Sequence, residues 1–254
     1  MVDVEKAIQL NPAYAPAYNH RGIIKDDKKD YNGALADYYM ALKFDPKSWK
    51  TYQNIGIVKF KQKDYDSAIT SYTEAIKLEN SDFWKASSYY GRGLAKMRKG
   101  DLDGAMADCM QAIKLKPKYA DAYHVRGDAE RYKGNYDNAI ADYNYTIEIN
   151  PKAAYAYSDR ARAKEGKYDD DGAIVDYTKA IEIDPNYWWA YWHRGMTMKH
   201  MSNYDGAIAD FTKAIELDPK NAEIYRERSE LRRITHDYDG AMSDLDKAAN
   251  LGQN

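Results

Sequence analysis

One short phrase recurs along the chain and limits what it can fold into. Residues 205–219 read DGAIADFTKAIELDP, and near-copies stand at 137–151 (DNAIADYNYTIEINP) and 171–185 (DGAIVDYTKAIEIDP). Fixed periods of this length are typical of solenoids, in which each unit buries its apolar surface against its neighbours. Aligned on a recurring Tyr-x-x-Arg-Gly, the 34-residue units are 15–48, 49–82, 86–119, 120–153, 154–187, 188–221 and 222–254, the last cut short.

Small and large residues recur at fixed positions within each unit. Position 4 is Tyr and position 20 is Ala in all seven units, while position 8 is Gly in five and position 32 is Pro in five. Positions 4, 7, 8 and 11 share one face of a helix, and positions 20, 23, 24 and 27 share one face of a second helix. Small residues let the two helices approach closely, and Pro ends the second helix. Each unit is therefore predicted to be a helical hairpin, and the fold to be all-α.

The residues at positions 4, 8, 17, 20, 24, 27 and 32 resemble the pattern of the tetratricopeptide repeat (TPR) family over nearly the whole chain. This resemblance implies a right-handed superhelical solenoid of antiparallel helical hairpins, with the first helix of each hairpin lining the concave face. For function, it implies a scaffold that holds other proteins together. We therefore expect a single TPR array over residues 1–254.

The two ends of the chain depart from the repeat. Residues 1–14 fit positions 21–34 of a preceding unit, so we expect a half repeat there. The final residues, DKAANLGQN, lack the additional polar helix that often covers the last hairpin of such arrays. Two interpretations stay open: an excised segment of a larger protein, whose targeting signal was lost with the missing part, or a divergent full-length chain.

Two internal joints also depart from the repeat. Phe83, Trp84 and Lys85 form an insertion (83–85) that predicts either a longer first helix with its rings packed at the joint or an exposed aromatic hook. In EGKYDDDGAI (165–174), Tyr168 lies two positions early, which predicts that the first helix ends sooner and the turn lengthens. The Asp run before Gly172 lacks the ligand spacing of a calcium loop, so we expect a solvated turn.

Opposite charges recur at two facing positions of the hairpin. Position 7 is Arg and position 23 is Asp in the same six units, whereas the second unit has Ile55 and Ser71. Because the two positions change together, we predict a partly buried structural ion pair in each of the six hairpins. The predicted pairs are Arg21 with Asp37, Arg92 with Asp108, Arg126 with Asp142, Arg160 with Asp176, Arg194 with Asp210, and Arg228 with Asp244.

No residue pattern favours catalysis or metal binding. Cys109 occupies position 24, where other units carry Tyr, Phe or Leu, so it is predicted to be a core residue rather than a nucleophile. The five histidines are spread over different units, and the pair His193 and His200 lacks a third ligand. We therefore expect no enzyme, no catalytic residue, no metal site and no cofactor.

Charge and hydropathy exclude other classes of partner. The formal net charge of -2 gives no electrostatic attraction to nucleic acid or to anionic lipid. The apolar runs are too short for membrane insertion. A single cysteine fits a reducing compartment, so we expect a cytoplasmic protein.

The predicted groove is where the repeats stop resembling one another. Positions 2, 5, 9, 12 and 13 of the first helices are mixed in charge, with aromatic residues concentrated in the sixth unit. Large aromatic side chains are plausible anchors for a partner, although Trp188, Trp189 and Trp192 equally fit a tight interface between the fifth and sixth units. The predicted groove residues are Phe60, Tyr90, Tyr132, Tyr155, Arg162, Trp189, Trp192, Met196, Lys199 and Arg226.

These features predict a non-enzymatic scaffold that binds a peptide or protein segment in its concave groove, across the fourth to sixth units. Arg162 and Lys199 are expected to orient the partner. Alternatives are a self-assembly module that stacks through exposed terminal hairpins into homo-oligomers, or an adaptor segment of a larger protein. A clamp for chaperone C-termini is disfavoured, because only Asn54 matches the residues such clamps use.

Overall fold

The computed structural model describes residues 2–252, which form helices joined by short turns, with no strand in that range. A first short helix, α1 (Val2–Leu10), packs on α2. The first helices of the hairpins are α2 (Ala15–Asp27), α4 (Trp49–Lys61), α6 (Asp82–Arg98), α8 (Ala120–Tyr132), α10 (Ala154–Glu165), α12 (Trp188–His200) and α14 (Ala222–Ile234). The second helices are α3 (Tyr31–Phe44), α5 (Tyr65–Leu78), α7 (Leu102–Leu115), α9 (Tyr136–Ile149), α11 (Asp170–Ile183), α13 (Tyr204–Leu217) and α15 (Tyr238–Leu251).

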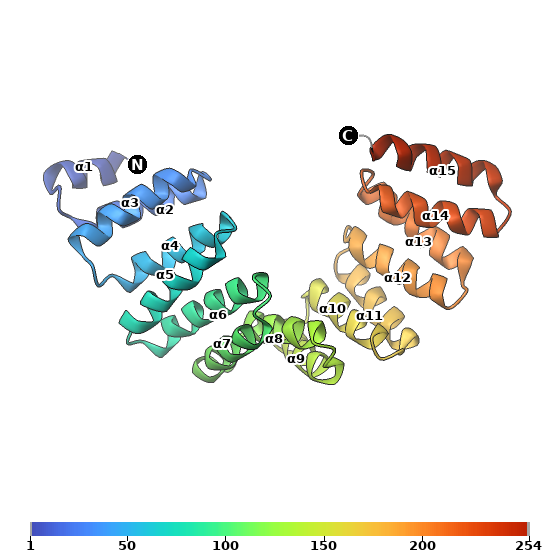
Figure 1. Cartoon of the computed structure of the whole chain (residues 1–254), viewed down its shortest axis with the longest axis horizontal. Helices are drawn as coiled ribbons and strands as arrows, with labels where there is room; N and C mark the ends of the chain where they lie inside the picture. Colours follow the sequence, from blue (N-terminus) through green and yellow to red (C-terminus); the bar gives the residue numbers. More distant parts are fainter. Residues whose placement is uncertain (1, 253–254) are drawn as a thin grey trace. The chain divides into compact units, whose positions relative to one another are not determined.

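The helices form two compact units, each made of several repeats, and the boundary lies between Lys133 and Gly134. From here on, the first unit means the helices before this boundary and the second unit means those after it. In the first unit α2 packs on α3, α4 on α5 and α6 on α7; in the second α10 packs on α11, α12 on α13 and α14 on α15 (Figure 1). Each hairpin also contacts the next one within its unit, as α5 contacts α6 and α11 contacts α12. The predicted fold class, an all-α array of antiparallel helical hairpins, is confirmed for both units.

The turn inside each hairpin repeats one backbone device. The residue at position 15 has a positive φ in every hairpin, although it is Gly only at Gly100 and Gly134. The next residue is Asp or Asn, and in six hairpins its side chain accepts a hydrogen bond from the backbone N–H three residues later, which caps the second helix. These caps are Asp30, Asp64, Asp101, Asp169, Asn203 and Asp237.

The two irregular joints change helix length as the sequence indicates. α10 ends at Glu165, and four residues separate it from α11, whereas three separate α12 from α13. The insertion lengthens α6 to 17 residues, compared with 13 in α4. The inserted rings are not buried at the joint, since Phe83 is 52% and Trp84 46% exposed. The longer helix is thus present, but its aromatic side chains stay half in solvent.

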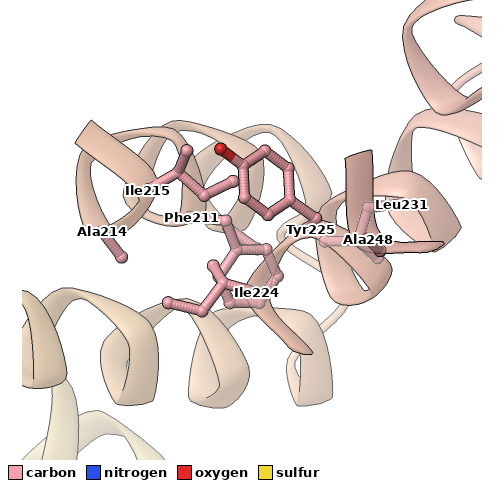
Figure 2. Packing of buried hydrophobic residues seen from close by; sticks show 8 residues of the cluster. Phe211, Ala214, Ile215, Ile224, Tyr225, Leu231 and Ala248 are labelled. Carbon is pink, nitrogen blue, oxygen red and sulfur yellow. The ribbon is translucent and has the colours of Figure 1, made fainter. Parts of the chain in front are cut away.

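The core lies where small residues of the first helix meet an aromatic ring of the second. A Cβ added to Gly22 would lie 2.4 Å from the Tyr38 ring, and one added to Gly195 would lie 2.7 Å from the Phe211 ring. Figure 2 shows a buried cluster between successive hairpins, in which Phe211 of α13 packs beside Ile224 of α14. Cys109 is fully buried at the position equivalent to Phe211, as predicted for a core residue.

Gly100→Ala is expected to lower the free energy of unfolding by about 1 kcal/mol, because L-residues disfavour the left-handed region. Gly100 has a φ of 85°, and an added Cβ would meet no atom within 4 Å, so the backbone conformation is the whole penalty. Tyr168→Gly is expected to raise the free energy of unfolding, since Tyr168 has a φ of 62° and its 87% exposed side chain contributes little packing. Chemical denaturation measures both changes, and equal stability of the Gly100→Ala and parent chains would contradict this account.

Candidate partner-binding surfaces

The structure brings together five of the six predicted Arg–Asp pairs. In the pair of α10 and α11, Arg160 Nε lies 2.9 Å from Asp176 Oδ2, and Arg160 Nη2 lies 2.6 Å from Asp176 Oδ1. The same two-pronged contact joins Arg21 to Asp37, Arg92 to Asp108, Arg194 to Asp210 and Arg228 to Asp244. The carboxylates are at most 6% exposed. Arg126 lies before the boundary at Lys133 and Asp142 lies after it, and their pair stays a prediction.

The remaining guanidinium nitrogen reaches the preceding hairpin, which the sequence reasoning missed. Arg160 Nη1 donates to the Asn144 side chain at 2.6 Å, and Arg194 Nη1 donates to the Thr178 hydroxyl at 2.9 Å. These acceptors all occupy position 25 of the preceding repeat. The recurrence of Thr or Asn at that position could have identified them from the sequence. The equivalent bonds join Arg92 to Thr73 and Arg228 to Thr212.

A second cation also contacts most of these carboxylates. Lys164 Nζ lies 2.8 Å from Asp176, one helical turn beyond Arg160. Lys25, Lys96 and Arg232 lie equivalently beside Asp37, Asp108 and Asp244. Both oxygens of each carboxylate thus accept hydrogen bonds inside the hairpin. These charged residues therefore stabilise the fold and do not form a site for an anionic ligand.

Removing one member of a pair is expected to destabilise the chain strongly. Asp176→Ala leaves Arg160 and Lys164 without their carboxylate, which should cost about 3–5 kcal/mol. The double variant with Arg160→Leu should cost less than the sum, because the two residues share one interaction. Ser71→Ala is the matched control at the same repeat position, since the Ser71 hydroxyl bonds only to the Ser67 carbonyl of its own helix. Strict additivity in denaturant unfolding would contradict the coupling.

The Asp37 carboxylate makes the stability of its hairpin sensitive to acid. Burial alone would raise its pKa, but hydrogen bonds from Arg21 and Lys25 outweigh burial and lower the pKa below the ordinary 3.8. An acid with a depressed folded pKa contributes stability that is present above its unfolded pKa and is lost as the pH falls through the folded value. When the pH is lowered from above 3.8 to below it, we therefore expect the free energy of unfolding to fall more for the parent chain than for Asp37→Asn. Equal losses in pH-dependent denaturation would contradict this assignment.

In the second unit, aromatic side chains of α12 gather with a cation from α10. The Trp189 ring lies 3.8 Å from the His193 ring and 6.0 Å from the Tyr187 ring. The Arg162 guanidinium lies 5.1 Å from the Trp189 ring centre, in cation–π contact. Tyr155 lies in the first turn of α10 and lines a hollow of about 390 Å³ together with Tyr187. These half-buried rings leave part of their surface accessible.

The tryptophans of this group also belong to the core between repeats. Trp189 packs against the buried cluster around Tyr177, while Trp192 and Met196 pack against the cluster around Phe211. Both predicted roles, groove and interface, therefore describe the same rings. Trp192 Nε1 is buried without a hydrogen-bond partner in the described structure. An unpaired buried donor carries a desolvation penalty.

Lys199 is paired within the chain, whereas Arg226 forms no ion pair among the described residues. Lys199 Nζ lies 2.8 Å from Glu227 and 2.5 Å from Glu230. Its charge is thus balanced by two carboxylates of α14, and its orienting role stays a prediction. Arg226 is exposed on α14.

Glu165, which the sequence reasoning overlooked, lies among these residues. Its carboxylate accepts hydrogen bonds from the Tyr177 hydroxyl at 3.0 Å and the Thr197 hydroxyl at 2.5 Å, which joins α10 to α11 and α12. Burial raises its pKa, against the lowering effect of these bonds and of the Arg162 charge. Glu165 is therefore a structural acid that joins α10 to α11 and α12.

The predicted groove residues of the first unit lie apart from one another. Phe60 packs on Tyr65 at 5.5 Å, and Tyr90 packs on Tyr119 at 5.2 Å, so both are half-buried. Tyr132 is 62% exposed and lines a hollow of about 610 Å³ with Met97, Arg98 and Asp128. The one residue of chaperone-clamp type, Asn54, donates a hydrogen bond to Asn19.

No helix among the described residues is long and apolar enough to cross a membrane. An array of helical hairpins with accessible aromatic rings belongs to a fold class typical of protein–protein interaction. Models of the tetratricopeptide repeat match residues 50–82, 86–119, 120–152 and 188–221, and a TPR repeat model matches 160–201. The chain belongs to the tetratricopeptide repeat family.

Solved structures agree with this assignment. A crystal structure of MamA protein is 31% identical with a TM-score of 0.60, over 67% of this chain and 92% of that one. A TPR protein from Parabacteroides merdae ATCC 43184 is 21% identical with a TM-score of 0.73, over 94% and 93% of the two chains. YrrB, described as a TPR protein with an unusual peptide-binding site, is 23% identical with a TM-score of 0.60, over 74% and 95%. The last two show the fold alone, and a search of curated proteins found no match.

Proposed function

We propose that this chain is a non-enzymatic scaffold that binds a peptide or protein segment through the second unit. The proposed contact surface, here termed the tryptophan patch, consists of Tyr155, Arg162, Trp189, Trp192 and Met196. The family supports the scaffold role, because TPR proteins are generally non-enzymatic interaction modules. A cytoplasmic location, part of the same proposal, is supported by the single free and buried cysteine, Cys109.

The observation that carries the proposal is a half-exposed aromatic ring with a cation beside it. Trp189 offers an accessible aromatic face in contact with the Arg162 guanidinium. Rings anchored in a rigid frame lose little conformational freedom when they bind, which favours them as hot spots. The partner that fits has an apolar side chain for the rings and a carbonyl or carboxylate oxygen for Arg162.

Two variants separate binding from stability at this patch. Trp192→Phe keeps most of the apolar volume but removes the unpaired N–H, so stability should be unchanged or slightly higher. Its affinity for the partner should be nearly unchanged, because the N–H is buried and a partner does not reach it. Trp189→Ala should weaken binding by about 2 kcal/mol or more, and should also lower stability because the ring is part of the core.

The partner is obtained by affinity capture from a lysate of the source organism, identified, and titrated by calorimetry against each variant. Trp188→Phe is the control, since Trp188 stacks on Trp192 at 6.1 Å and lies outside the patch as defined. Full affinity of the folded Trp189→Ala chain would place the binding surface elsewhere. Concentration-dependent light scattering with no captured partner would favour the alternative, self-assembly into homo-oligomers.

A further inference from the structure

The extra turn of α6 creates a second aromatic surface, in the first unit. Phe83 and Trp84 lie on that turn and pack edge to face, with ring centres 5.1 Å apart. Trp84 also packs on Trp49, the first residue of α4, at 5.8 Å. About half of the Phe83 and Trp84 surfaces stays exposed. Together with Lys50 and Lys116, these three rings are here termed the aromatic edge.

Two lysines lie against the rings of the aromatic edge. Lys50 Nζ is 5.5 Å from the Trp49 ring centre, and Lys116 Nζ is 5.0 Å from that of Phe83 and 4.4 Å from that of Tyr119. Neither ammonium group forms an ion pair with the residues that the structure describes. Other lysines of the first unit do so: Lys61 pairs with Asp26, Lys99 with Asp66, and Lys133 with Asp103.

The acidic side chains that begin this joint do not pair with these lysines. Glu79 is buried, and its Oε1 accepts a hydrogen bond from the Ser81 backbone N–H at 2.6 Å. Asp82 lies in the first turn of α6, where the positive end of the helix favours it. The aromatic edge therefore presents apolar rings beside two ammonium groups that form no ion pair among the described residues.

The inserted residues are not required to join one hairpin to the next. α11 connects to α12 through 184–187 with no insertion, and the two helices still pack together. The added turn of α6 instead places rings beyond the regular length of a first helix. Half-exposed large aromatic side chains in a group are unusual unless they serve an interaction.

We propose that the aromatic edge is a docking surface for an acidic peptide segment that carries an aromatic or large aliphatic side chain. The apolar side chain packs on Phe83 and Trp84, and flanking carboxylates pair with Lys50 and Lys116. Charge complementarity selects an acidic partner over a basic one, because a basic segment would meet two uncompensated ammonium groups. The aromatic edge and the tryptophan patch lie in different units. The proposal for one surface can therefore be refuted without affecting the proposal for the other.

The test is selection of a displayed random peptide library against the full chain, followed by titration of the enriched peptides. We expect enriched peptides to place Asp or Glu beside an aromatic or aliphatic residue. Phe83→Ala and Trp84→Ala should each weaken their binding at least about tenfold. Lys116→Glu should weaken binding severalfold and more strongly at low salt. Melting by circular dichroism should show all three variants folded, since the altered side chains are largely outside the core.

Two further chains complete the experiment. Tyr39→Ala is the matched control, because Tyr39 is 52% exposed, like Phe83, but lies on α3 away from these rings. It should bind normally. Deletion of residues 83–85 restores the 34-residue period and should abolish binding in a folded chain. The proposal is overturned if no peptide is enriched, if enriched peptides are basic, or if acidic ones bind the Phe83→Ala and Trp84→Ala chains with unchanged affinity.

Discussion

The contact between Arg at position 7 and Asp at position 23 holds the structure together at two levels. Two guanidinium nitrogens bind the carboxylate inside one hairpin, and the third binds a side chain of the preceding hairpin, as Arg194 binds Asp210 and Thr178. A planar guanidinium can do both at once because its donors point in fixed, divergent directions, which a lysine ammonium does not reproduce. The second hairpin lacks this contact, since Ile55 stands at the position of the Arg and Ser71 at that of the Asp.

Residues that this frame does not use are the ones available to a partner. Facing positions are filled by small residues against one large ring, as in Gly195 against Phe211, and leave little room for a larger side chain. The tryptophan patch differs because its rings are large enough to serve the core on one side and remain accessible on the other. Side chains that are fixed by core contacts before binding reduce the entropy lost on association. In the proposed binding mode, the frame thus contributes to recognition by immobilising the rings that it does not fully bury.

The sequence was sufficient for features that one repeat determines by itself. The hairpins, the small residues and the Arg–Asp positions follow from helical periodicity within 34 residues, and the structure contains them. Features that depend on the next repeat were missed. The ion pairs of Lys199 with Glu227 and Glu230 join it to the following hairpin. Glu165 was overlooked because its partner Thr197 lies in the next repeat. Such contacts depend on how far one hairpin turns relative to its neighbour, which periodicity does not specify.

The place of the insertion follows from the energetics of a repeat array. Stability is approximately a sum of hairpin terms and nearest-neighbour interface terms, so a local change affects only the units beside it. Three residues added inside a hairpin would shift positions 7 and 23 out of register and separate an Arg from its Asp. Added between hairpins, they extend α6 at its N-terminal end, and Arg92 still binds Asp108 with distances of 2.8 and 2.6 Å. The joint between hairpins is therefore the point at which such an array can gain a new surface, such as the aromatic edge, without losing the contact on which its fold depends.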